Sequence, residues 1–232
     1  MMTAKQLQAC FKCSWIDEQC IRKCIQPEIG AIANNPDYRC VWPQNEESIF
    51  QAFSIIDRFP RLVIMGQEPY PDERATGLAF EVISEKHDHA KSSLKSLCRS
   101  MECSESWFDI RKWAADNDIL LVNAALSCSG LSDCKNKQYR IWRPFWSVMI
   151  RILIHSRTIT VLSLGRKSES LFKNYKSQLG KRFFYSPHPL DRHNGFNMTK
   201  SAWKKIQKLS GIKLPTPFTD ERSNLSEGKK EQ

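Results

Sequence analysis

The residues best suited to chemistry lie together in the segment GQEPY, residues 66–70. This segment places an amide, a carboxylate and a phenol around a rigid proline, directly after the apolar run 62–65. Apolar residues that include β-branched ones and stop at a glycine predict a short buried strand. Because ligands of open α/β sheets bind beyond the carboxyl ends of the strands, Gln67, Glu68 and Tyr70 are candidate site residues. The alternative is an ordinary strand-to-loop turn with a solvated glutamate.

Apolar runs separated by amphipathic segments predict the fold that positions these residues. We predict strands at 61–66, 118–123, 158–164 and 182–185. We predict helices at 3–26, 46–57, 92–100, 107–117, 141–155, 168–177 and 199–209. Strands that alternate with helices predict an α/β fold. We expect a single domain with a central four-stranded, mostly parallel sheet and helices on both of its faces.

Parallel strands bring their carboxyl ends to the same edge of a sheet. The second predicted strand ends at the polar residue Asn123, and the first is likewise followed by polar residues. The predicted strands deliver these segments to one crevice: residues 67–70, Asn123, residues 165–167 and residues 186–193. This crevice is therefore the expected ligand site.

The domain boundaries follow from composition. We expect a cysteine-rich helical segment at 1–35 packed on an α/β domain at 36–213, and a disordered polar tail at 214–232. No apolar run approaches the roughly 20 residues of a membrane span. The first residues lack the long apolar core of a signal peptide. An intracellular location is therefore expected, in the cytoplasm or in the nucleoid or nucleus.

The charge balance favours a polyanionic partner. The chain has 35 Lys and Arg against 25 Asp and Glu, a formal net charge of +10. Nucleic acid is the simplest partner for such a chain, although solubility alone would explain the same sign. Hydroxyls and helix N-terminal amides can also bind phosphates. Candidate DNA contacts near the strand ends are Ser92, Ser93, Arg166, Lys167, Ser186, Arg192 and His193.

The cysteines do not predict a disulfide framework, because nine is an odd number and the chain is expected to be intracellular. Four of them crowd the N-terminus and could hold zinc or an iron–sulfur cluster: Cys10, Cys13, Cys20 and Cys24. Several of these positions also recur at roughly helical spacing, which is typical of buried structural thiols. We favour structural thiols and no metal.

Four stretches at the expected strand ends carry a resemblance to a known family. They are GQEPY at 66–70, GLAF at 77–80, LLVN at 120–123 and SPHPLDRHNGF at 186–196. In order and spacing they resemble the motifs of family 1 uracil-DNA glycosylases, and CVWP at 40–43 also fits. The resemblance runs from about residue 36 to residue 212 and does not cover the N-terminal cysteines.

The resemblance implies that the protein removes uracil from DNA after extruding the base into a pocket. In this family Phe80 would stack on the base, and Asn123 would read its edge by offering a donor to O4 and an acceptor to N3–H. Tyr70 would crowd C5 and exclude the methyl group of thymine. Gln67 would help line the pocket.

The resemblance also assigns the chemical step and the partners. Glu68 occupies the position of the catalytic carboxylate, and a histidine of the fourth motif would stabilise the departing base at O2. Leu190 sits where the family inserts an apolar side chain into the vacated base stack. The reaction needs no metal or redox cofactor. The expected partner of a monomer is uracil-containing DNA, single- or double-stranded, and a DNA-mimic protein inhibitor is a further candidate.

The chain departs from the family at three positions. The family has aspartate in place of Glu68 and histidine in place of Pro71. In a gapless alignment Ser186 takes the place of the family's histidine, and we assign contact with the leaving group to His188. These departures leave two alternatives open. One is a catalytically weakened DNA-binding or scaffold protein on the same fold, and the other is a glycosylase for another damaged base.

Overall fold

The computed structural model describes residues 2–38, 40, 42–82, 93–103, 108–128, 135–191 and 195–215. Its centre is a sheet of four parallel strands in the order β2-β1-β3-β4. The strands are β1 (Leu62–Gly66), β2 (Ile119–Asn123), β3 (Thr160–Leu164) and β4 (Phe183–Ser186). The predicted α/β fold with a four-stranded parallel sheet is therefore confirmed.

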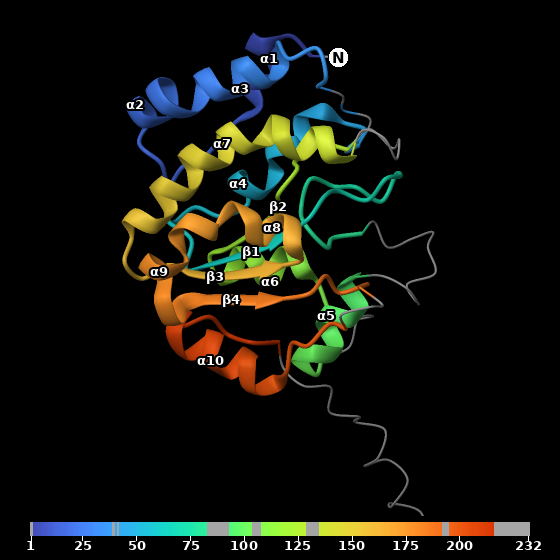
Figure 1. Ribbon diagram of the computed structural model, residues 1–232, viewed down its shortest axis with the longest axis vertical. Coiled ribbons are helices and arrows are strands. Elements are labelled where there is room, and N and C mark those ends of the chain that lie inside the picture. The colour runs from blue at the N-terminus through green and yellow to red at the C-terminus, as the bar shows by residue number, and fades with distance from the viewer. Residues whose placement is uncertain are drawn as a thin grey trace, which may run out of the picture.

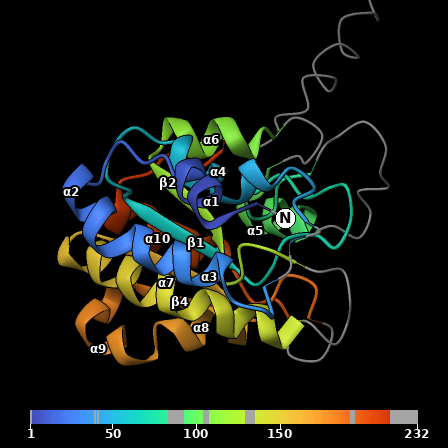
Figure 2. The same cartoon turned by 90° about the horizontal axis from the view of Figure 1, so that it is seen from above.

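The helices form layers on both sides of the sheet, as predicted. Figure 1 shows α7, with α1 and α3 beyond it, on one side, and α5 with α10 on the other. Seen from above, α3 lies beside α7 (Figure 2). Their bounds are α1 Ala4–Cys10, α2 Glu18–Cys20, α3 Gln26–Ala33, α4 Gln51–Ser54, α5 Ser93–Met101, α6 Ile110–Asp116, α7 Lys135–His155, α8 Arg166–Leu171, α9 Lys176–Leu179 and α10 Lys200–Ser210.

Shorter or irregular helices complete the described elements. A π-helix, η1 (Ile21–Ile25), joins α2 to α3, and the 3₁₀ turn η2 (Glu46–Phe50) leads into α4. Two further 3₁₀ turns, η6 (Lys173–Tyr175) and η7 (Gly180–Arg182), flank α9. No helix in the described ranges is long and apolar enough to cross a membrane.

The long helix α7 is tied to the chain that follows β2. The indole N–H of Trp142 donates to the hydroxyl of Ser127 at 2.9 Å, and that of Trp146 donates to the carbonyl of Ala124 at 2.9 Å. Both tryptophans are fully buried. Because buried polar groups must be paired, these bonds fix the segment that begins directly after Asn123.

The prediction of one helix over 3–26 is wrong. The helix α1 ends at Cys10, and the helical structure resumes at α2 and continues through α3 to Ala33. Phe11 leaves the helix in an extended conformation (φ −76°, ψ 100°), and its ring packs 5.3 Å from that of Phe50. Asp17 then starts the second helix by accepting hydrogen bonds from two backbone N–H groups.

Other helix ends also differ from the prediction. The predicted helix 46–57 is a 3₁₀ turn followed by one short helix that ends at Ser54. The predicted helix 168–177 is divided among α8, η6 and α9. In contrast, α7 begins at Lys135, six residues before its predicted start at Ile141. Most of the predicted tail, residues 216–232, lies outside the described residues.

Candidate active site

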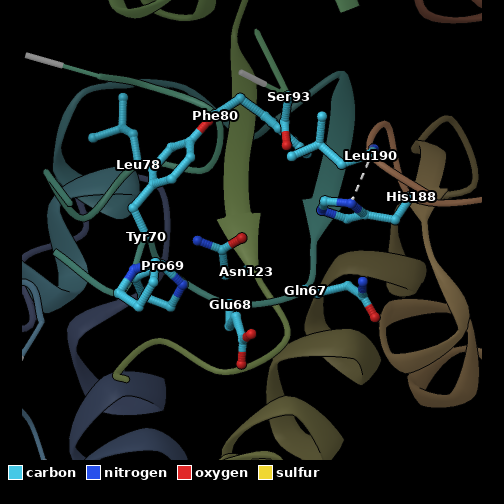
Figure 3. A pocket seen from close by; sticks show the side chains of 11 residues that line it. Gln67, Glu68, Pro69, Tyr70, Leu78, Phe80, Ser93, Asn123, His188 and Leu190 are labelled. Carbon is cyan, nitrogen blue, oxygen red and sulfur yellow. Dashed lines mark hydrogen bonds between the residues drawn. The ribbon is translucent and has the colours of Figure 1, made fainter. Parts of the chain in front are cut away.

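A pocket of about 210 Å³ opens at the carboxyl ends of β1 and β2 (Figure 3). Sites for drug-sized ligands usually hold about 300–1,000 Å³, so this pocket suits a smaller molecule. Its lining combines aromatic rings with an amide, a carboxylate and an imidazole. The lining residues are Gln67, Glu68, Pro69, Tyr70, Pro71, Leu78, Phe80, Ser93, Asn123, His188 and Leu190.

Gly66 lets an amide and an aromatic ring meet at the base of the pocket. It is the last residue of β1 and pairs in register with Asn123 of β2. A Cβ atom on Gly66 would lie 2.5 Å from Oδ1 of Asn123 and 3.1 Å from Cζ of Phe80. A side chain at this position would therefore displace both groups.

The Asn123 amide is available to a ligand. Asn123 is 6% exposed, and within the described part of the chain its side chain makes no hydrogen bond. A molecule in the pocket can therefore pair with this amide. The amide can both donate and accept, and it can therefore distinguish ligands by the pattern of their edges.

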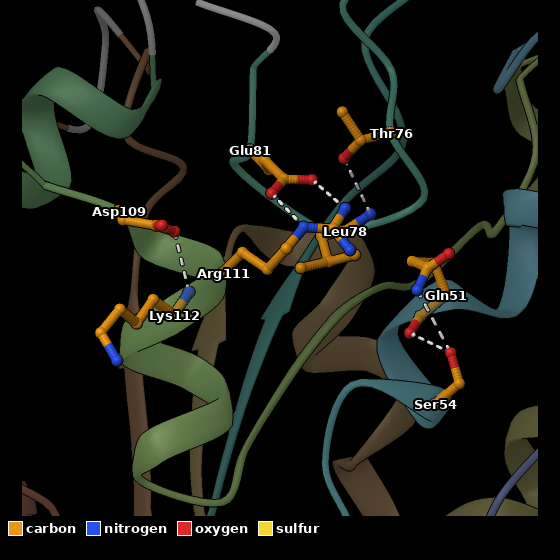
Figure 4. Close-up of polar contacts among 8 residues, drawn as sticks. All are labelled: Gln51, Ser54, Thr76, Leu78, Glu81, Asp109, Arg111 and Lys112. Atoms are coloured by element: carbon orange, nitrogen blue, oxygen red, sulfur yellow. Dashed lines mark hydrogen bonds and ion pairs between the residues drawn. The ribbon is translucent and has the colours of Figure 1, made fainter.

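Phe80 is held in a strained conformation. Its φ of 69° is unusual for an aromatic residue and costs about 1–3 kcal/mol. The neighbouring residues fix it from both sides. On one side, Gly77 packs so closely on the backbone that a Cβ atom there would lie 1.8 Å from the carbonyl oxygen of Ser48. On the other side, Glu81 accepts two hydrogen bonds of 2.7 Å from Arg111 (Figure 4). The ring is therefore pre-positioned at the pocket wall.

Tyr70 is half-buried and presents a neutral phenol. Burial raises the pKa of Tyr70, while nearby Ser93 and the Arg74 guanidinium oppose this rise. The Cζ atom of Arg74 lies 4.8 Å from the ring centroid, and Arg74 is paired with Asp72 at 2.5 Å. The loop that begins at Pro71 is therefore braced by an ion pair against the tyrosine ring.

Glu68 faces α7, where it meets a residue that the sequence analysis missed. That residue is Tyr139 of α7. Burial raises the pKa of Tyr139, and the negative charge of Glu68 raises it further. Tyr139 lies just before the helix predicted at 141–155, so no local pattern marked it.

Gln67 points in a different direction from Glu68 (Figure 3). Its side chain covers Gly165 at the start of α8, where a Cβ would lie 2.8 Å from Cδ of Gln67. Gly165 also has a φ of 100°, which favours glycine. The amide of Gln67 therefore packs on the edge of the pocket rather than at its base.

His188 lines the pocket, whereas Ser186 does not. The Nδ1 atom of His188 accepts a hydrogen bond from the N–H of Leu190 at 3.3 Å (Figure 3). The hydrogen of the neutral imidazole is therefore on Nε2. Burial lowers the pKa of His188, while Asp191 opposes this effect. Ser186 is fully buried, and its hydroxyl accepts from the N–H of Asn197 at 3.3 Å.

Of the residues expected to contact DNA, Ser93 and Leu190 line the pocket, whereas the expectation for Ser186 is wrong because its side chain is fully buried. Leu190 is 46% exposed at the rim, and Ser93 is buried at the first position of α5. Arg166 and Lys167 are exposed at the start of α8. The remaining expected contacts lie outside the described residues, namely Ser92, Arg192 and His193.

The N-terminal cysteines are not gathered into a site. Within the described ranges, no group of three or more His, Cys, Asp or Glu side chains could hold a metal ion. Burial raises the pKa of Cys13 to about 12, and Cys10 donates to the carbonyl of Gln6 at 3.2 Å. Cys20 is half-buried and Cys24 is exposed.

Comparisons with known proteins agree with the resemblance read from the motifs. No protein-family model matches the chain. The chain is 32% identical over 124 residues to a uracil-DNA glycosylase of Ruegeria sp. (strain TM1040), covering 44% of this chain and 52% of that protein. It is 29% identical over 151 residues to a uracil-DNA glycosylase of Chlamydia pneumoniae, covering 59% of this chain and 60% of that protein.

Solved structures agree on the fold. The wild-type UNG of Nitratifractor salsuginis superposes with a TM-score of 0.63 at 19% identity, covering 93% of this chain and all of that one (100%). A point mutant of the same protein gives a TM-score of 0.59 at 18% identity, covering 91% and 98%. The sequence matches span only about half to three fifths of the curated relatives' length. The chain is thus similar in sequence to part of two uracil-DNA glycosylases, and it shares its fold with the UNG structures.

Proposed function

We propose that the protein is a DNA glycosylase that flips uracil out of DNA and hydrolyses its N-glycosidic bond. The product is an abasic site, which places the protein in base excision repair. One observation carries the proposal: Gly66 lets Asn123 and Phe80 meet in a small pocket whose lining also includes Glu68 and His188. The similarity to named uracil-DNA glycosylases supports it.

Asn123 selects the base. Its amide donates to O4 of uracil and accepts from N3–H. Cytosine presents the opposite pattern, a donor in place of O4 and an acceptor in place of N3–H. The amide would then face a donor with its donor and an acceptor with its acceptor, which is costly in a buried site. Phe80 provides the stacking surface. Tyr70 lies against C5, where the extra methyl of thymine would collide with the ring.

Glu68 and His188 act on opposite sides of the bond that breaks. Departure of uracil breaks C1′–N1 and leaves a cationic sugar and an anionic base. The Glu68 carboxylate stabilises the cation and accepts a proton from the water whose oxygen bonds to C1′. The Nε2–H of neutral His188 donates to O2 and stabilises the uracil anion. No cofactor takes part in these steps.

The surface around the pocket binds the DNA strand. A base in a duplex is out of reach, and its extrusion costs a few kcal/mol. Exposed Leu190 enters the gap left in the stack, and Arg166 and Lys167 contact phosphates. The protein acts as a monomer inside the cell, in the cytoplasm or in the nucleoid or nucleus. A DNA-mimic protein inhibitor would bind the same surface.

Base release from matched oligonucleotides tests this function. Each oligonucleotide carries a single deoxyuridine, thymidine, deoxycytidine or deoxyinosine, and each is tested single-stranded and in a duplex. We expect the protein to release uracil alone. Asn123→Leu, which keeps the size but removes the polar atoms, should lower kcat/KM by about 10²–10³-fold. Tight binding without any release would favour the scaffold alternative, and release of another base would replace uracil as the substrate.

A further inference from the structure

Arg111 binds the residue that directly follows Phe80, although among the described residues it does not line the pocket. Its Nε and Nη2 atoms each donate a hydrogen bond of 2.7 Å, one to each carboxylate oxygen of Glu81 (Figure 4). The Glu81 side chain is only 14% exposed. A two-point pair of this kind fixes direction as well as distance, and a mostly buried carboxylate is costly without its partner. The contact therefore differs from an ordinary surface ion pair.

Arg111 is itself fixed at the start of α6. Asp109 caps this helix by accepting a hydrogen bond of 2.8 Å from the backbone N–H of Lys112 (Figure 4). Trp113 is buried in the core on the same helix, and α6 packs against β2. The guanidinium of Arg111 therefore has a defined position relative to the strand that ends at Asn123.

The segment that carries Phe80 is tied to the same strand. The backbone N–H of Ala79 donates to the carbonyl of Leu121 in β2 at 3.3 Å. Phe80 then takes its positive φ, and the next residue, Glu81, reaches α6. The ring is thus held between two anchors, one on β2 and one on the helix that precedes β2. Because β2 ends at Asn123, the ring and the amide are positioned by one rigid frame.

The strained backbone of Phe80 makes the anchor on α6 necessary. A residue in a sparsely populated region of φ and ψ persists only when its surroundings over-determine it. Without Arg111, the Glu81 carboxylate would have to turn toward water, and Phe80 could relax to a negative φ. The ring would then leave the place where its Cζ atom approaches Gly66 beside the Asn123 amide.

Resting on the function proposed above, we propose that Arg111 is a positioning residue for stacking of the base. By binding Glu81, it keeps the Phe80 ring beside the Asn123 amide, so that one base contacts both groups. Arg111 itself does not touch the substrate.

A double-mutant cycle between Arg111 and Phe80 tests this role by uracil release from a single-stranded oligonucleotide with one deoxyuridine. Arg111→Gln should lower kcat/KM by about 10–100-fold, within the range that loss of base–aromatic stacking costs. Arg111→Lys keeps the charge but not the two-point geometry, so it should lose less than Arg111→Gln. In the Phe80→Leu background, which has no ring to position, Arg111→Gln should change kcat/KM by less than about threefold.

The matched control is Lys112→Gln, one residue along α6. It removes the same charge and an exposed ion pair of 3.0 Å with Asp116, and it should leave kcat/KM within about twofold of the native value. Equal kcat/KM in Arg111→Gln and Lys112→Gln would overturn the proposal. An equal loss with and without the Phe80 ring would also overturn it, since the role would then be independent of the ring. Thermal unfolding identifies any variant that does not fold, and Arg111→Lys replaces Arg111→Gln in that case.

The position of the ring can be measured without activity, by NMR of the protein labelled with ¹⁵N at glycine. The ring current of Phe80 should act on Gly66, because a Cβ atom there would lie 3.1 Å from Cζ of the ring. Phe80→Leu identifies this contribution. Arg111→Gln should move the Gly66 resonance in the same direction, and Lys112→Gln should leave it in place.

This measurement separates the proposal from the proposed function. If Arg111→Gln leaves the Gly66 resonance unmoved, the ring does not depend on Arg111, and the proposal is wrong whatever the activity. If the resonance moves in a protein that releases no uracil, the anchor between Arg111 and Glu81 is kept and the proposed function is rejected.

Discussion

Replacing Gly66 with alanine adds one methyl group where β1 meets the pocket. That methyl would lie 2.5 Å from Oδ1 of Asn123 and 3.1 Å from Cζ of Phe80. Carbon atoms pack at about 3.5–4.0 Å, so the amide and the ring must move by roughly 0.5–1 Å. Both groups belong to the surface that we assign to the base. Because misplacement by about 1 Å can cost about 10²-fold in rate, kcat/KM for uracil release should fall by about that factor.

The assay is uracil release from a single-stranded oligonucleotide with one deoxyuridine. The matched control is Gly30→Ala, which adds the same methyl inside α3, where the nearest atom is the flexible end of the Gln8 side chain at 2.8 Å. Alanine is favoured over glycine in a helix by about 1 kcal/mol, so this control should retain both activity and stability. Native activity in a folded Gly66→Ala protein would refute the assigned contact of Asn123 and Phe80 with the base.

Three further predictions concern pH, salt and the duplex. Burial lowers the pKa of His188 below its usual 6.5, so as pH falls the unfolded chain is protonated at this histidine before the folded chain is. The stability that the neutral His188 gives above about pH 6.5 is therefore lost as pH falls toward the folded-state pKa. The free energy of unfolding, measured with urea, should therefore differ less between the native chain and His188→Gln in acid than at neutral pH. A difference that grows in acid would contradict the lowered pKa of His188. Oligonucleotide affinity should fall steeply with salt. Arg166→Gln should reduce the slope of the log binding constant against log salt concentration by about 0.7–0.9, and an unchanged slope would show that Arg166 does not contact a phosphate. Leu190→Ala should slow release from duplex DNA by roughly tenfold or more and spare single strands, whereas equal losses would reject the wedge.

The sequence predicts the sheet and the centre of the pocket because local patterns specify them. The apolar run 62–65 ends at Gly66, and the run 119–122 ends at Asn123. A parallel register then places these two ends side by side, as the structure confirms. The motif around Phe80 is equally local, although its positive φ is not visible in the sequence.

Long-range contacts explain what the sequence could not predict. The prediction of a helix at 3–26 missed the break at Phe11, because the ring leaves the helix to pack on Phe50, which is distant in the chain. Tyr139 lies in the polar segment that opens α7, and only the tertiary fold brings it to Glu68. The alignment left Ser186 and His188 as competing candidates, and their burial, not their spacing, shows that His188 is the one that lines the pocket.

The central claim is that Glu68 promotes cleavage of the bond between uracil and deoxyribose in this pocket. The most direct test is single-turnover uracil release by the native chain and by Glu68→Gln, which keeps the size of the side chain but removes its charge. The account predicts release by the native chain and a loss of about 10²–10⁴-fold in the variant, with oligonucleotide binding retained. Equal rates in the two proteins, or tight binding by the native chain with no release at all, would contradict it.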